Sequence, residues 1–185
     1  DSRYADICEI EFYNGFLSST SLSGEKFFYE NPLEIQPKLK DRTVAAERSR
    51  GEHFAITERV KVFDCSCCPP NIVRFVPSFG EYMYTYDDNT VYDHHYAEST
   101  AKVGGATITQ ITDYPNSGNI KINAENVNTL AFRIPFWCKK YEIKLNGATA
   151  FADIKKGYAY IDVNGSTEIE IDFEIKEQNE SFNEK

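Results

Sequence analysis

The sequence lacks the features that would place it in a membrane or on nucleic acid. It has no run of about 18 consecutive apolar residues, which a membrane-spanning helix needs. Only 20 basic side chains stand against 29 acidic ones, and a net charge of −9 disfavours binding to nucleic acid or to an anionic membrane. We therefore expect neither of these partners.

Other signals are absent or scarce. There is no secretory signal, no initiator Met and no internal repeat, and Met and Trp occur once each. The sequence opens at Asp1 within a predicted helix. We therefore expect a cytoplasmic protein and a chain that is part of something longer.

The composition is that of a folded protein rich in strands. Hydrophobic residues make up 41% and charged residues 26% of the 185 residues, a balance that excludes wholesale disorder. The 12 Tyr and 13 Phe favour strands. The length fits one domain or slightly more.

The first part of the chain, residues 1–80, predicts helical and irregular structure. Residues 4–17 predict a helix because Cys8, Phe12 and Phe16 recur every four residues and form an apolar stripe. Residues 26–30 predict a short strand, and the polar residues 36–53 predict a long exposed loop.

A second helix is expected after Pro69 and Pro70, since proline suits the first helical positions, and it should end near Gly80. Residues 1–80 contain too few helices to close a helical domain by themselves.

The pattern changes at Tyr82, where short alternating runs separated by turn residues begin. Asn146-Gly147 and Asn164-Gly165 are typical hairpin turns. Eight runs are predicted as strands: 82–86, 90–96, 106–112, 119–124, 129–135, 141–145, 158–163 and 167–175. Their spacing predicts a mainly β module over 81–176, an antiparallel β-sandwich or barrel, followed by a frayed tail at 177–185.

The five cysteines carry the most chemical information. Cys65, Cys67 and Cys68 fall within four positions, while Cys8 and Cys138 are isolated. An odd count does not suit a closed disulfide framework, and clustered thiols without a secretion signal favour metal ligands or a reactive site. Zinc accepts such thiolates, but two further ligands would have to come from elsewhere.

A family resemblance follows from this cluster. Cys65-Ser66-Cys67-Cys68-Pro69-Pro70-Asn71 resembles the Cys-x-Cys-Cys-Pro-Pro-Asn signature of glycoside hydrolase family 127, the β-L-arabinofuranosidases. Six further segments resemble family segments in the same order: Tyr4–Glu9, Tyr13–Gly15, Lys26–Leu33, Leu130–Cys138, Lys144–Gly147 and Lys156–Tyr158.

The resemblance implies an architecture. Residues 1–80 would be the C-terminal end of a catalytic (α/α)6 barrel, and residues 81–176 a jelly-roll-like β-sandwich that follows it. The remainder of the barrel becomes an expected partner of this chain. A bacterial source and a further copy of the chain in a homo-oligomer are also expected, although no residue indicates the second.

The resemblance also implies a chemistry, directed at L-arabinofuranoside glycans. Cys67 matches a zinc-held thiolate nucleophile, Cys68 matches a second zinc ligand, and Cys65 matches a nearby cysteine that is a third candidate ligand. Glu9 matches a family glutamate near the sugar. The family's acid/base glutamate and remaining zinc ligands have no match in this sequence, so the chain alone is expected to be inactive.

Several residues have a plainer interpretation. Cys8 and Cys138 are expected to pack as small apolar side chains. Phe136 and Trp137 could form a platform for a sugar, although core packing is the more common role of such aromatics. His94 and His95 are adjacent in a predicted strand, point to opposite faces and should not share a metal ion.

Two other functions stay open from the sequence. The sandwich could be a non-catalytic module that binds carbohydrate or supports other domains. A thiol redox protein is a weaker hypothesis, because no Cys-x-x-Cys motif is present.

Overall fold

A computed structural model describes residues 1–29, 59–62, 68–87, 89–163 and 165–177. These residues belong to two compact units. One consists of Asp1–Asp6 and Gly80–Lys185, and the other of Ile7–Phe79. Among the described residues, every helix is too short or too polar to cross a lipid bilayer.

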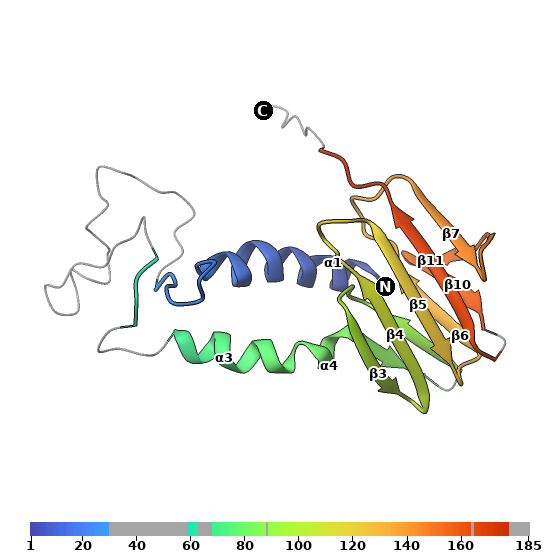
Figure 1. Cartoon of the computed structure of the whole chain (residues 1–185), viewed down its shortest axis with the longest axis horizontal. Coiled ribbons are helices and arrows are strands. Elements are labelled where there is room, and N and C mark those ends of the chain that lie inside the picture. The colour runs from blue at the N-terminus through green and yellow to red at the C-terminus, as the bar shows by residue number, and fades with distance from the viewer. Residues whose placement is uncertain (30–58, 63–67, 88, 164, 178–185) are drawn as a thin grey trace, which may run out of the picture. The chain divides into compact units, whose positions relative to one another are not determined.

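The first unit is built from two β-sheets (Figure 1). A five-stranded sheet has the order β1-β2-β6-β10-β9, and a six-stranded sheet has the order β3-β4-β5-β11-β7-β8. The strands are β1 (Tyr84–Tyr86), β2 (Thr90–Asp93), β3 (Ser99–Val103), β4 (Ala106–Thr112), β5 (Asn119–Glu125), β6 (Thr129–Arg133), β7 (Tyr141–Leu145), β8 (Ala148–Thr149), β9 (Asp153–Lys155), β10 (Tyr158–Asp162) and β11 (Thr167–Phe173).

Alternating side chains of the two sheets form one core. In β11, every second residue from Thr167 to Phe173 is buried, so one face of this strand points inward. Gln110 of β4 donates hydrogen bonds to Tyr84 and Asp93 of the other sheet, which shows that the two inner faces meet. The predicted β-sandwich is therefore confirmed, with one difference: β2 pairs with β6 in parallel.

Three strands were not predicted, and each lacks the apolar alternation on which the prediction depends. The sequence of β3, STAKV, has no fully buried residue, β8 has two residues, and all of β9 is exposed. β9 and β8 lie at sheet edges, where a strand needs only one hydrogen-bonded neighbour and little apolar surface.

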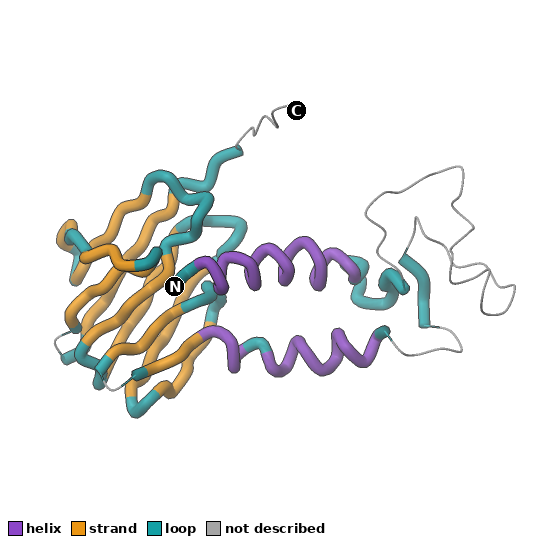
Figure 2. Tube along the Cα trace, turned by 180° about the vertical axis from the view of Figure 1, so that it is seen from behind, coloured by secondary structure: helices purple, strands orange, loops and turns teal. Residues whose placement is uncertain are grey.

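The helices are α1 (Arg3–Ile10), a π-helical turn (Glu11–Phe16), a short 3-10 turn (Leu17–Ser19), α3 (Pro69–Ser78) and α4 (Gly80–Met83). The helix predicted for residues 4–17 is thus present, although its second half is wound more widely. In the unit Ile7–Phe79, the π-helical turn and α3 lie side by side (Figure 2).

The strand predicted at 26–30 was wrong in the described part of that range. Phe27 forms only isolated bridges, to Thr20 and to Val60, and is buried between them. The predicted loop at 36–53 lies outside the described residues.

Candidate functional site

The cysteine motif leads directly into α3. Cys65 and Cys67 lie outside the described residues, so the structure gives no position for the predicted nucleophile. Cys68 is the residue before the first helical position, and Pro69 and Pro70 follow at the first two. Proline there costs no backbone hydrogen bond, since those N–H groups have no partner within a helix.

The Cys68 side chain is partly buried. Its Sγ lies 3.8 Å from the backbone carbonyl oxygen of Tyr29, within the range of a hydrogen bond from sulfur. The ring of Tyr29 packs on Phe27 with 4.6 Å between the centroids. Two segments far apart in the sequence therefore meet at the beginning of α3.

Four phenylalanines join the π-helical turn to α3. Phe12 stacks on Phe79 with 4.4 Å between ring centroids, and Phe16 packs on Phe75 at 4.6 Å. The earlier residue of the π-helical turn thus pairs with the later residue of the second segment, and the later one with the earlier. The two segments therefore run in opposite directions. This cluster fixes the end of α1 against the helix that the cysteine motif begins.

Glu9 and Cys8 lie in α1, just before the aromatic cluster. Glu9 is buried, with 7% of its surface exposed, and it interacts with other residues. Cys8 is exposed, so the prediction that it packs inside this chain was wrong; α1 turns that part of the apolar stripe outward.

Metal-binding capacity can be judged only in part. Among the described ranges, no three His, Cys, Asp or Glu side chains gather closely enough to hold an ion. Cys68 contributes one thiol, the soft ligand that zinc prefers. The two other cysteines of the motif lie outside the described residues.

A buried ion pair stands at the other end of α1. Arg133 Nη1 donates to Asp6 Oδ1 at 2.7 Å, and the two side chains are 0% and 7% exposed. Arg133 Nε also donates to the His94 carbonyl at 2.7 Å, and the Phe136 N–H donates to Asp6 Oδ1 at 3.3 Å. The Ser2 N–H adds a backbone bond to the Lys156 carbonyl.

The histidines next to this pair take part in structure. His94 Nδ1 lies 2.6 Å from the Tyr158 hydroxyl, and its Nε2 lies 2.8 Å from Thr85 Oγ1. Burial and the nearby Arg133 charge lower the pKa of His94 and of His95 to about 4. Both rings are therefore neutral at pH 7.

Burial also raises the pKa of a tyrosine and of an aspartate in this unit. It raises the pKa of Tyr158 to about 12. It raises the pKa of Asp93 well above its usual range, although Arg133 opposes the shift. One Asp93 oxygen accepts from Gln110 at 3.0 Å, and the other has no hydrogen-bond partner among the described residues.

Trp137 is placed for packing. Its ring lies between Tyr114 and Phe173, with centroid distances of 6.4 Å and 6.3 Å. Phe136 is 61% exposed. Cys138 is buried, as predicted, and its Sγ lies 3.1 Å from the Lys140 carbonyl oxygen. Trp137 therefore takes part in packing, whereas Phe136 is mainly exposed.

Models of known protein families match the chain in two parts, one mainly helical and one mainly β. The family model of the β-L-arabinofuranosidase GH127 catalytic domain matches residues 1–81. The model of the GH127 middle domain matches residues 90–176.

The chain belongs to glycoside hydrolase family 127.

Individual relatives agree with this assignment. A non-reducing end β-L-arabinofuranosidase of Bifidobacterium longum subsp. longum is 31% identical over 94% of this chain. The crystal structure of a GH127 β-L-arabinofuranosidase from Geobacillus stearothermophilus T6 is 35% identical, with a TM-score of 0.74, and a second solved glycoside hydrolase is 30% identical, with a TM-score of 0.77. Both structures match 94% of this chain.

This GH127 chain is much shorter than those relatives. It spans 27% of the Bifidobacterium protein and 28% and 29% of the two solved chains.

Sequence reasoning missed the Asp6–Arg133 pair. Both residues stand in the segments that carry the GH127 resemblance, but they are 127 positions apart. The available signal was a charge within the apolar run Leu130-Ala131-Phe132-Arg133-Ile134-Pro135, since a buried arginine needs an anionic partner.

Proposed function

We propose that this chain carries the nucleophile of a retaining β-L-arabinofuranosidase, and that Cys67 is that nucleophile. One observation carries the proposal: the Cys65–Asn71 motif falls inside the segment matched by the GH127 catalytic domain. The activity named for the Bifidobacterium relative supports L-arabinofuranoside glycans as substrates.

The proposed cofactor is zinc, held by Cys65, Cys67 and Cys68 with further ligands from outside this chain. The partly buried Cys68 side chain at the beginning of α3 suits such a ligand set. A bound zinc ion would keep the thiols ionised at neutral pH, where a free thiol with a pKa of about 8.5 is mostly protonated.

The proposed reaction has two steps. The Cys67 sulfur attacks the anomeric carbon; a carbon–sulfur bond forms, the glycosidic carbon–oxygen bond breaks, and the leaving oxygen takes a proton from a carboxylic acid. Water then attacks the same carbon, the thiolate departs, and the carboxylate takes the water's proton. Two inversions give retention, as in glycosidases with a carboxylate nucleophile.

Glu9 is proposed to bind the sugar. A buried carboxylate is a strong acceptor for sugar hydroxyls, because charge-assisted hydrogen bonds are shorter and stronger than neutral ones. The acid/base glutamate would come from the portion of the relatives that this chain does not match, so the chain alone is proposed to be inactive.

Exposed apolar side chains support an association with the rest of a catalytic domain. In α1, Ile7 and Ile10 are 54% and 43% exposed, and in α3 Val73 and Val76 are 70% and 55% exposed. Isolated apolar residues on a surface are normal, but rows along two helices indicate a surface that another element covers.

The experiment joins residues 1–185 to the preceding part of the Geobacillus relative's catalytic domain and measures hydrolysis of an aryl β-L-arabinofuranoside. Cys67→Ala should abolish turnover, whereas Cys138→Ala, which changes a buried thiol in the β unit, should retain it. Removal of zinc by a chelator should also abolish turnover, and added zinc should restore it. Full turnover by Cys67→Ala would refute the proposal.

A further inference from the structure

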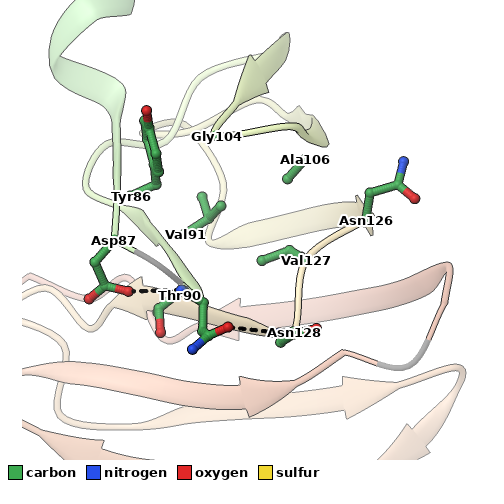
Figure 3. A pocket seen from close by; sticks show the side chains of 10 residues that line it. Tyr86, Asp87, Thr90, Val91, Gly104, Ala106, Asn126, Val127 and Asn128 are labelled. Atoms are coloured by element: carbon green, nitrogen blue, oxygen red, sulfur yellow. Dashed lines mark hydrogen bonds between the residues drawn. The ribbon is translucent and has the colours of Figure 1, made fainter.

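A small pocket lies at one end of the β-sandwich, and its lining residues are distant from the cysteine motif in the sequence. It has a volume of about 80 Å³, and turns between strands of both sheets line it. Figure 3 shows Tyr86 on one side and Asn126 on the other, with Val91, Ala106 and Val127 between them.

The pocket has an ordered aromatic wall. Tyr86 is 62% exposed, yet Gly104 lies directly against its ring: a Cβ at Gly104 would be 2.5 Å from Cδ2 and 2.7 Å from Cγ. Glycine is favoured at position 104 for two reasons: a side chain would collide with the Tyr86 ring, and the backbone has a φ of +59°. An exposed ring supported in this way loses little freedom when a ligand stacks on it.

The lining also offers neutral amides. Asn128 Nδ2 donates to Asn89 Oδ1 at 3.0 Å, and this bond orients both side chains. Within the described residues, the remaining amide group of each, Asn89 Nδ2 and Asn128 Oδ1, has no side-chain partner. One donor and one acceptor thus lie close together, a combination that matches neighbouring hydroxyl groups.

The pocket's charge and floor restrict the ligand further. Its one charged side chain, Asp87, already accepts from the Tyr92 hydroxyl at 3.0 Å and from the Thr90 N–H at 3.0 Å. Val91 and Ala106, which form the floor, are buried and apolar. A ligand with one apolar face, several hydroxyls and no charge fits this lining.

We infer that this pocket is a carbohydrate subsite for one neutral sugar unit of a longer glycan, with Tyr86 as its stacking platform. One water molecule needs roughly 10–15 Å³ of such volume, so a pocket of about 80 Å³ admits the hydroxyl-bearing edge of a sugar while the ring stays outside against Tyr86. Such a shallow site should bind weakly, with a Kd of about 1 mM.

The test is an NMR titration of the ¹⁵N-labelled 185-residue chain with an L-arabinofuranose oligosaccharide; this choice of sugar rests on the proposed function. Saturable shifts are expected at residues 86, 87, 89–91, 104–106 and 126–128. Glycerol at the same hydroxyl concentration should not reproduce them. Scattered shifts that do not saturate, or none at millimolar sugar, would overturn the inference.

Variants separate the ring from the fold. Tyr86→Ala should weaken binding about tenfold or more, the scale expected for losing one aromatic contact, and Tyr86→Phe should retain it. Phe151→Ala is the matched control, because Phe151 is an aromatic residue that is 98% exposed elsewhere in the same unit. Equal loss in both alanine variants, or no loss in either, would refute a site at Tyr86.

The amide of Asn126, which also lines the pocket, has its own test. Asn126 has a φ of +57°, so Asn126→Gly removes the amide without straining the turn, and weaker binding is expected. This test does not depend on catalysis, because Cys67→Ala should leave sugar binding at the Tyr86 pocket unchanged. If the titration shows no binding at this pocket while turnover by the completed catalytic domain still requires Cys67, the subsite alone is refuted.

Discussion

Arg133 and Asp6 form an ion pair whose two side chains are both buried. Arg133 also donates to the His94 carbonyl, so its guanidinium connects the first helix to two strands of the five-stranded sheet. A buried pair adds little net stability relative to apolar residues, but removing one partner leaves an uncompensated charge.

Arg133→Met should therefore lower the free energy of unfolding by about 3–5 kcal/mol. Urea unfolding can be followed by the fluorescence of Trp137, which is the only Trp and lies in the same unit. The control is Arg3→Met, because Arg3 is 79% exposed and its bond to Asp1 should contribute less than about 1 kcal/mol. Equal effects of the two substitutions would contradict this role of Arg133.

The sequence could indicate residue types at the candidate site but not their neighbours. The cysteine motif was readable because its residues are consecutive. The Asp6–Arg133 pair and the Cys68–Tyr29 contact, 39 positions apart, depend on how distant segments fold together. A local pattern can mark one member of such a pair, as the charge within the apolar run at Arg133 does, but it does not identify the partner.

At the scale of elements, the contact between β5 and β11 illustrates a close backbone approach. Gly118 precedes β5, and a Cβ there would lie only 1.9 Å from the Phe173 carbonyl oxygen at the end of β11. The Phe173 N–H donates to the Gly118 carbonyl at 3.0 Å, so neither backbone can move away without losing this bond.

Gly118→Ala should accordingly destabilise the β unit by about 1–3 kcal/mol, the usual cost of overpacking. Gly80→Ala is a suitable comparison, since nothing lies within 4 Å of its added Cβ. Both can be measured by urea unfolding with Trp137 fluorescence. A loss of stability in Gly80→Ala that matches that of Gly118→Ala would count against the steric explanation.

Helix α3 has two apolar faces. Phe75 and the C-cap residue Phe79 contact the π-helical turn, whereas Val73 and Val76 are exposed. In the 185-residue chain, Val73→Lys with Val76→Lys should lower the fluorescence of a bound hydrophobic dye without reducing helicity. Ile111→Lys, at a site 53% exposed in β4, should lower it less. Unchanged dye binding in the α3 variant would contradict an apolar docking face there.

The strands illustrate what pattern reasoning can reach. β11 was predicted well because TEIEIDF alternates and is buried on one face only. β3 was missed because STAKV contains no strong apolar alternation, and its position follows from pairing with β4. The parallel pairing of β2 with β6 also depends on the complete topology rather than on either strand.

At the scale of the whole molecule, the stability should depend on pH. An unfolded histidine has a pKa of about 6.5, whereas burial and Arg133 lower the pKa of His94 and His95 to about 4. Between these values the unfolded chain binds protons that the folded chain excludes, so the free energy of unfolding should fall as the pH drops from 6.5 to 4.

Asp93 acts in the opposite direction. Burial raises its pKa, so the folded chain takes up that proton before the unfolded chain and gains stability on acidification. Urea unfolding at several pH values should still show a decrease below pH 6.5, because two histidines oppose one aspartate. His94→Gln should make the decrease shallower. A stability that rises steadily from pH 6.5 to pH 4 would contradict these assignments.

The chain joins a segment of a GH127 catalytic domain to a GH127 middle domain, and its chemistry is proposed to reside in the first. The central claim is that sulfur, not oxygen, attacks the sugar. A catalytic domain completed from the Geobacillus relative, stopped with acid during turnover, can be digested and analysed by mass spectrometry. We predict one pentosyl group on Cys67. A pentosyl group on a glutamate or aspartate instead would contradict the account.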